Sequence, residues 1–199
     1  MVEDNILPVI NCPGNVTVSC NASAAPAATG TATATDNCAV ASVTHTDVST
    51  QDANANAAGH YNYTITRTWK ATDVNGKFST CVQTITVNDL TAPAITAPAN
   101  IVVKADNVCK AQNVALGTPA TTDNCSPVSV TSNAPASYSL GNTTVTWTAT
   151  DASGNASTAT QVVTVNDSTA PSIACPGNIV VNNMTDSCGA IVNYTLPVV

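Results

Sequence analysis

Cysteine and aspartate are the residues of this chain whose types and spacing could do chemistry. The sequence holds eight cysteines but no Cys-x-x-Cys pair and no cluster of cysteine with histidine, so zinc binding is not indicated. Cysteines spread along a chain in this way indicate structural disulfides, which persist in oxidising compartments. We therefore expect an extracellular or cell-surface protein.

Few residues could act as catalysts. The only histidines, His45 and His60, stand apart from any nucleophile motif, and no Gly-x-Ser-x-Gly, P-loop or His-Glu-x-x-His sequence is present. The net charge of −7, from five basic and twelve acidic residues, argues against a nucleic-acid partner. No run approaches the roughly 18 apolar residues of a membrane-spanning helix. We predict that the chain is not an enzyme and has no membrane span in this segment.

Internal repetition is the main organising feature of the sequence. A Pro-x-Ile-x-x-Pro-x-Asn head occurs three times, at residues 8–15, 93–100 and 171–178. A Trp-x-Ala-Thr-Asp-x-x-Gly block occurs at 69–76 and 147–154, so the later heads and the two blocks share a spacing of 78 residues. The first unit is about seven residues longer, and we assign the surplus to a polar loop at 49–59.

The repeated unit reads as a small β-sandwich. Runs such as the one around Trp69 alternate inward and outward residues with period two, and Asn, Asp and Gly separate them. We predict an all-β chain of tandem immunoglobulin-like sandwiches. The expected domains are 1–90, in which 1–6 is the tail of a preceding joint, then 91–168, and 169–199 as the truncated start of a third unit. The sequence thus reads as an excerpt of a longer protein.

The repeats also predict which cysteines pair. Cys12 and Cys81 align with alanines in the second unit, Ala97 and Ala159. Both cysteines are thus absent from that unit, as expected if they are bonded to each other. The predicted disulfides are Cys12–Cys81, Cys20–Cys38 and Cys109–Cys125. Cys175 and Cys188 are expected to pair with residues of the missing part of the third unit, and a Cys175–Cys188 bond is the alternative.

These motifs together resemble the hyalin repeat, or HYR, domain. The head, the Thr-Asp-Asn-Cys loops (35–38 and 122–125), the Trp-x-Ala-Thr-Asp-x-x-Gly block and the Cys-Gly-Ala at 188–190 carry the resemblance. It implies an immunoglobulin-like sandwich that is arrayed on extracellular and bacterial surface proteins and associated with adhesion. It implies no catalytic residues. The second unit departs from the pattern because it lacks the outer disulfide.

Aspartates recur where one unit meets the next. Eleven of the twelve acidic residues are Asp, a residue that suits both turns and calcium. In a sandwich of this topology the entering joint, the Thr-Asp-Asn-Cys loop and the Asp-x-x-Gly turn should share one pole. The expected calcium ligands at the joint between units are Asn88, Asp89, Asp123 and Asp151. Those at the start of the first unit are Asp4, Asp36 and Asp73. The alternative is that these side chains only cap turns.

The sequence therefore predicts a structural and adhesive repeat segment, either the stalk of a cell-surface adhesin or part of a surface filament. Its expected partners are further repeats of the same protein, and a surface glycan or protein. The alternative function is capture of a glycan or protein through the pole loops, including the loop at 49–59. A further possibility is that a neighbouring copy completes the unfinished third unit with its own strands.

Overall fold

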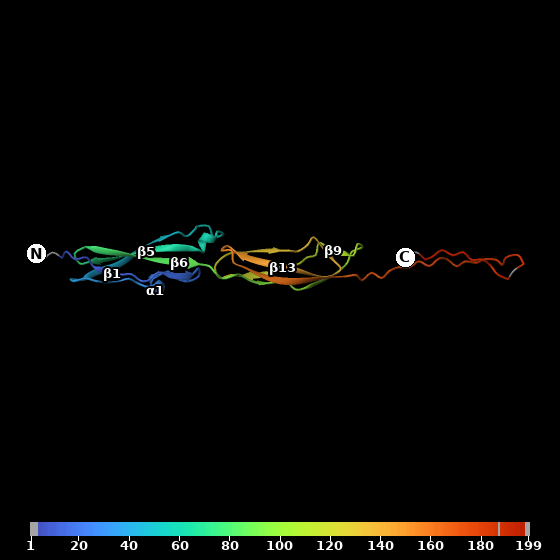
Figure 1. The fold of residues 1–199 in the computed structure, drawn as a ribbon, viewed down its shortest axis with the longest axis horizontal. Coiled ribbons are helices and arrows are strands. Elements are labelled where there is room, and N and C mark those ends of the chain that lie inside the picture. Colours follow the sequence, from blue (N-terminus) through green and yellow to red (C-terminus); the bar gives the residue numbers. More distant parts are fainter. Residues whose placement is uncertain (1–3, 187, 198–199) are drawn as a thin grey trace.

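The computed structural model describes residues 4–186 and 188–197. Two groups of strands follow each other along the long axis of the molecule, and an extended segment follows the second group (Figure 1). Nearly all regular structure is β, and each group builds an immunoglobulin-like sandwich. The predicted fold class is confirmed.

The first sandwich has one four-stranded sheet and one small strand pair. Its elements are β1 (Val9–Asn11), β2 (Val16–Ser19), α1 (Pro26–Thr29), β3 (Thr33–Thr35), β4 (Val40–Ser49), the 3-10 turn η1 (Ala58–His60), β5 (Tyr63–Asp73) and β6 (Phe78–Asn88). The sheet has the order β2-β6-β5-β4, in which β2 runs parallel to β6 and the other pairs are antiparallel. The β1-β3 pair packs against β5 and β6 and so forms the second layer.

The second sandwich repeats this plan. Its elements are β7 (Ala94–Thr96), β8 (Ile101–Lys104), β9 (Lys110–Gln112), β10 (Ala120–Thr122), β11 (Val128–Ser132), β12 (Ser137–Ser139), β13 (Gly141–Asp151) and β14 (Ala156–Asn166). The main sheet has the order β11-β13-β14-β8, again with one parallel pair, β14 with β8. The second layer is made by the pairs β10-β7 and β12-β9. The two long hairpins correspond strand for strand, because Trp69 faces Cys81 and Trp147 faces Ala159.

Beyond β14 the described residues form no strand. The segment 167–197, apart from position 187, is mostly exposed and turns back on itself, with a hydrogen bond of 3.0 Å from the Met184 N–H to the Gly189 carbonyl. The chain that was expected to begin a third unit is therefore extended here.

Each core is small and alternates along the long strands as the pattern predicts. In β5 the inward residues are Ile65, Arg67, Trp69, Ala71 and Asp73. The second core groups Val145, Val163 and Val165 with Ala111 and Tyr138. Alanine and valine make up most of the buried apolar residues, so each unit buries few large side chains and gains from hydrogen bonds across the core.

A buried glutamine provides such hydrogen bonds in each sandwich. Gln161 is fully buried, and its Nε2 donates to the Ala99 and Leu116 carbonyls at 2.7 and 3.0 Å. Its Oε1 accepts from Trp147 Nε1 at 3.2 Å. Gln83 makes the equivalent contacts with Trp69 and two carbonyls in the first unit. The glutamine thus joins the tryptophan of the main sheet to loops of the opposite layer.

Arg67 occupies an inward position, where the alternation predicts an apolar residue. Its side chain is 2% exposed and forms a two-pronged contact with Asp47, with both N–O distances 2.8 Å. It also donates to Thr29 Oγ1 and the Ala24 carbonyl. These acceptors neutralise and satisfy the guanidinium, which explains how a charge can be buried here.

The Cys12–Cys81 disulfide is present, with its Cα atoms 5.9 Å apart. It joins the chain just after β1 to the middle of β6, that is, one layer to the other. In the second sandwich the equivalent pair is Ala97 and Ala159, so this bond is confined to the first unit.

The predicted Cys20–Cys38 and Cys109–Cys125 bonds are wrong. Cys20 follows β2, where its N–H bonds to the Asn88 carbonyl at the end of β6, whereas Cys38 lies in the loop at the opposite pole. The eleven residues of β6 separate these poles by roughly 33 Å, but bonded cysteines need Cα atoms within about 7 Å. Cys109 and Cys125 lie at opposite ends of β14 in the same way.

The second disulfide instead joins Cys20 of the first sandwich to Cys125 of the second, with Cα atoms 6.1 Å apart. The comparison of repeats assumed that partners belong to one unit, and a bond between units escapes that logic. Cys38, Cys109, Cys175 and Cys188 are exposed free thiols, so the alternative Cys175–Cys188 bond is absent as well.

Candidate functional site

The site built by both sandwiches is the joint between them. A short linker, residues 89–93, connects β6 to β7, and Asp89 at its start is only 2% exposed. The Asp89 N–H donates to Asn62 Oδ1 at 2.9 Å, and its carbonyl accepts from Asn155 Nδ2 at 3.1 Å. One linker residue is therefore bonded to both units.

Side chains continue this contact across the joint. Asn62 Nδ2 of the first unit donates to Ser153 Oγ of the second at 2.8 Å, and Ser153 Oγ donates to Asp89 Oδ2 at 3.2 Å. Asn62 stands where the second unit has Leu140, and Asn155 where the first has Lys77. Neither residue was predicted from the sequence to belong to the joint. The sequence feature that sets them apart is that each differs from its counterpart in the other repeat.

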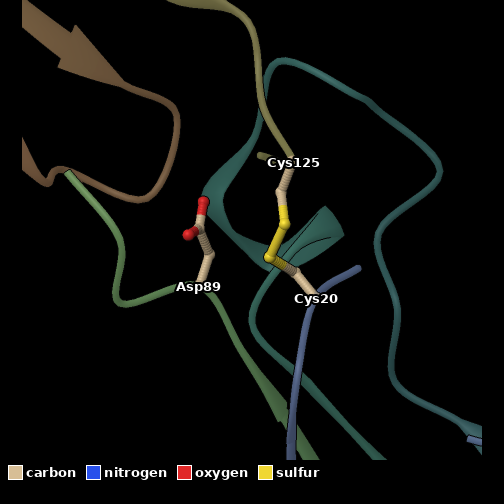
Figure 2. A group of neighbouring side chains, drawn as sticks. All are labelled: Cys20, Asp89 and Cys125. Atoms are coloured by element: carbon tan, nitrogen blue, oxygen red, sulfur yellow. A yellow bond between two sulfur atoms is a disulfide. The ribbon is translucent and has the colours of Figure 1, made fainter. Parts of the chain in front are cut away.

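The Cys20–Cys125 bond closes the joint covalently. Figure 2 shows the Asp89 carboxylate beside this bridge, on the chain segment that links the two units. Asn124 Nδ2 lies 3.3 Å from the Cys20 sulfur and 2.9 Å from the Cys125 sulfur. Since both sulfurs are bonded to each other, they cannot bind a metal as thiolates.

The longer loop of the first unit also reaches the joint. Residues 50–62 fold into successive turns, in which the Asp52 N–H donates to the Gly59 carbonyl and His60 Nδ1 lies 2.7 Å from the Asp52 carbonyl. Asn56 at its tip lines a hollow together with Pro127, Val128 and Thr150 of the second unit. The seven extra residues therefore lengthen the first sandwich toward the second (Figure 1).

Three of the predicted ligands gather at this joint. Asp89, Asp123 and Asp151 each place a carboxylate oxygen within 4.8 Å of the others. They come from the linker, the Thr-Asp-Asn-Cys loop and the end of β13. Asn88 follows the inward Val87 in β6, so the alternation of the strand places its side chain on the other face, and it lines a hollow with Ser19 and Leu90.

The first unit holds the equivalent residues at its outer pole. Oxygens of Asp4 and Asp36 lie within 4.8 Å of each other and of the Cys38 sulfur. Asp73, the counterpart of Asp151, is 2% exposed and acts electrostatically on the same thiol. A hydrogen bond with Asp4, burial and the charges of these three carboxylates raise the pKa of Cys38, so this thiol is a poor nucleophile at neutral pH.

Turn hydrogen bonds keep two of these carboxyl groups ionised. The N–H of Ile6 donates to Asp4 Oδ1 at 3.0 Å and lowers the pKa of that carboxyl below its ordinary value of 3.8. Burial raises the pKa of Asp123, but backbone donors from Ser126, Cys125 and Asn124 outweigh it and leave that pKa lowered. Both groups therefore carry negative charge at neutral pH.

The second sandwich matches a known family. Residues 88–165 match the family model of the HYR domain, from the last residue of β6 to within one residue of the end of β14. The predicted resemblance is confirmed for this range. The first sandwich shares with this matched range its strand order, its buried glutamine and its Trp-x-Ala-Thr-Asp-x-x-Gly hairpin.

Solved structures with a similar arrangement of strands are cadherin ectodomains. Drosophila N-cadherin EC1-4 is 13% identical over 81% of this chain, with a TM-score of 0.35. The protocadherin GammaB4 extracellular domain is 12% identical over 85%, with a TM-score of 0.35, and the human desmocollin-1 ectodomain 14% over 84%, with a TM-score of 0.26. The chain spans 50%, 34% and 42% of the lengths of these three chains. No curated protein sequence matches it.

The HYR match indicates an extracellular repeat module of the adhesion type. The two disulfides agree with an oxidising, extracellular setting. Among the described residues, no helix has the length and apolar character needed to cross a bilayer.

Proposed function

We propose that this chain is a non-catalytic structural and adhesive segment of a cell-surface protein, which holds sandwiches in series as the stalk of an adhesin or as part of a surface filament. Its direct partners are further repeats of the same protein. The function is geometric: it sets the distance between whatever lies at either end.

The joint is the observation that carries this proposal. A covalent bond between Cys20 and Cys125, and hydrogen bonds from Asn62 and Asn155 to the linker residue Asp89, restrain the same short connection. Two sandwiches that were joined only by a flexible linker would need none of these contacts. A spacer needs them because each restraint removes a direction of bending.

Capture of a glycan or protein through the pole loops has less support. The longer loop is turned toward the second unit, and the described residues that line the hollow beneath it include no aromatic side chain. Sugar-binding sites use aromatic faces for stacking, and protein hot spots are rich in Tyr and Trp. The loop therefore fits better as part of the joint.

Small-angle X-ray scattering of the full chain tests the spacer. With eleven-residue strands at about 3.4 Å per residue, the two sandwich centres should lie roughly 40 Å apart along one line. The expected distance distribution has a second maximum near that value and an elongated profile. A single compact maximum, or saturable micromolar binding of the chain to a glycan array or to cell-surface proteins, would contradict the spacer role.

A further inference from the structure

Two equivalent groups of three aspartates occur in the molecule, one at the leading pole of each sandwich. The joint triad is Asp89, Asp123 and Asp151, and the outer triad is Asp4, Asp36 and Asp73. In each triad one residue comes from the segment that enters the sandwich, one from the Thr-Asp-Asn-Cys loop, and one from the end of the long strand before the Asp-x-x-Gly turn.

Turn formation accounts for one oxygen of each carboxylate. Asp36 Oδ2 accepts from the Cys38 N–H at 3.0 Å, and Asp123 Oδ2 accepts from the Cys125 N–H at the same distance. Asp73 Oδ1 accepts from two backbone N–H groups, at 2.8 and 2.9 Å, in the turn closed by Gly76. These contacts are ordinary Asx turns, and they explain why the residue type is Asp or Asn at each position.

The turns do not use the second oxygens. Two of these oxygens in the joint triad accept from side chains, Asp89 Oδ2 from Ser153 Oγ and Asp151 Oδ2 from Asn155 Nδ2. Within the described part of the chain, the other four are buried and accept no hydrogen bond: Asp4 Oδ2, Asp36 Oδ1, Asp73 Oδ2 and Asp123 Oδ1. Asp73 as a whole is 2% exposed. A buried carboxylate oxygen without a partner is costly, and the outer triad has one on each of its three residues.

No basic side chain satisfies these oxygens. Over the described ranges 4–186 and 188–197, the one ion pair is Arg67 with Asp47, and no lysine or arginine pairs with either triad. The carboxylates of the joint triad, whose oxygens lie within 4.8 Å of one another, repel each other unless a cation lies between them, and so do those of Asp4 and Asp36.

We propose that each triad binds one calcium ion through its second carboxylate oxygens, which the Asx turns do not use. Calcium accepts six to eight oxygen ligands in irregular geometry, which suits donors from three separate loops, with backbone carbonyls and water completing the shell. Zinc is disfavoured because neither triad offers a histidine or a free thiolate pair, and magnesium because it demands a rigid octahedron and retains most of its water.

The ion at the joint would fix the linker to the second sandwich. Asp89 belongs to the linker, while Asp123 and Asp151 belong to the second unit, so one ion bound by all three restrains the linker at its first residue. This site lies beside the Cys20–Cys125 bridge but does not use its sulfurs (Figure 2). The inference does not depend on the spacer function, because calcium binding and molecular shape are measured separately.

Calcium titration of the full, oxidised chain by calorimetry tests the proposal. We expect two calcium ions per chain. We also expect the melting temperature in millimolar calcium to exceed that in EGTA by roughly 5–10 °C, because an ion that binds only the folded state stabilises it. Magnesium at the same concentration should give a much smaller shift.

Two variants assign the ions, and a third controls for the substitution. Asp36→Asn and Asp123→Asn keep an oxygen for the turn but replace the free oxygen with an amide, so each should lower the stoichiometry from two to one. Asp52→Asn changes an exposed Asx turn outside both triads and should still bind two ions. Circular dichroism in EGTA checks that all three variants are folded.

Absence of heat and of any melting shift in the wild-type chain at 10 mM calcium would overturn the proposal. So would two ions that persist in both Asp→Asn variants, because the ions would then lie elsewhere. If the wild-type chain binds one ion, the variant that abolishes it identifies the real site, and the proposal fails for the other triad.

Discussion

Polar residues inside these small cores hold the two layers together by hydrogen bonds, a role that apolar packing fills in larger sandwiches. Gln83 and Gln161 stand at equivalent inward positions, and each satisfies a tryptophan N–H and two carbonyls of the facing layer. The alternation of β14 marks position 161 as inward, but it cannot tell that a glutamine belongs there. That requires knowledge of which carbonyls the other layer leaves unpaired.

We predict that Gln161→Leu destabilises the second sandwich by about 2–4 kcal/mol, because an apolar side chain of similar size leaves the Trp147 N–H and the Ala99 and Leu116 carbonyls without their partner. Urea unfolding of the full chain, followed by Trp fluorescence, measures the loss. Thr160→Val, at the adjacent exposed position, is the control and should change the stability by less than about 0.5 kcal/mol. Equal effects of the two substitutions would show that the glutamine acts only as a space filler.

Arg67 and Asp47 give the first sandwich a measurable acid sensitivity. The hydrogen bonds from Arg67 lower the pKa of Asp47 below 3.8, and His45 on the same strand acts in the same direction. The unfolded chain therefore takes up a proton at higher pH than the folded chain. The stability that this pair contributes is complete above about pH 5 and is lost as the pH falls through the folded pKa.

We predict that Asp47→Asn lowers the stability at pH 7 by about 2 kcal/mol, because the buried guanidinium loses its counter-charge while Asp47 itself is a third exposed. The variant should also lose less of its melting temperature than the wild type between pH 5 and pH 3. Parallel acid-melting curves of the two proteins would contradict the pairing as the source of the acid sensitivity. Asp52→Asn serves again as the surface control.

At the scale of elements, the sequence predicts most of the fold. The period-two pattern and the Asp-x-x-Gly turns identify the long hairpins β5-β6 and β13-β14, where Gly76 and Gly154 adopt the positive φ that the turn requires. The strands of the second layer are only three residues long, which is too short for a periodic signal. The loop at 49–59 was located from the difference in repeat length, but its contact with the next unit depends on how the units are joined.

We predict that the double substitution Cys12→Ala/Cys81→Ala destabilises the first sandwich by about 4 kcal/mol, since the bond closes a loop across a sequence separation of 69. The same two positions are alanines in the second unit, so the substitution introduces side chains that this fold already accommodates. Urea unfolding with and without reductant measures the effect. If reductant destabilises the double variant as much as the wild type, the contribution belongs to Cys20–Cys125.

At the scale of the whole molecule, the joint is the part that the sequence predicted least well. Comparison of the repeats placed Asp89, Asp123 and Asp151 at one pole. It wrongly predicted that Cys20 and Cys125 form separate disulfides, each within its own unit. A comparison of repeats finds the features that the units share. The contacts of Asn62 and Asn155 and the inter-unit disulfide depend instead on which residues of one unit face which residues of the other. Only the relative placement of two sandwiches determines those contacts.

The disulfide connectivity can be read from one digest. Trypsin cleaves after the five basic residues and gives four large or diagnostic peptides: 1–67, 78–104, 105–110 and 111–199. After alkylation without reductant, we predict that 1–67 is bonded both to 78–104 and to 111–199, while Cys109 in 105–110 carries the alkyl group. Mass spectrometry before and after reduction detects these species.

Each rival arrangement leaves a different product. A Cys20–Cys38 bond would keep 1–67 free of 111–199, and a Cys109–Cys125 bond would attach 105–110 to 111–199. Either product would leave the joint without its disulfide, and the two sandwiches could then bend about the peptide linker at residues 89–93. The Cys20→Ser variant creates that state deliberately, so its scattering profile should broaden relative to the wild type while both sandwiches remain folded. An unchanged profile would mean that the contacts of Asn62 and Asn155 with Asp89 suffice to align the units. The disulfide would then stabilise the joint without setting the angle between the units.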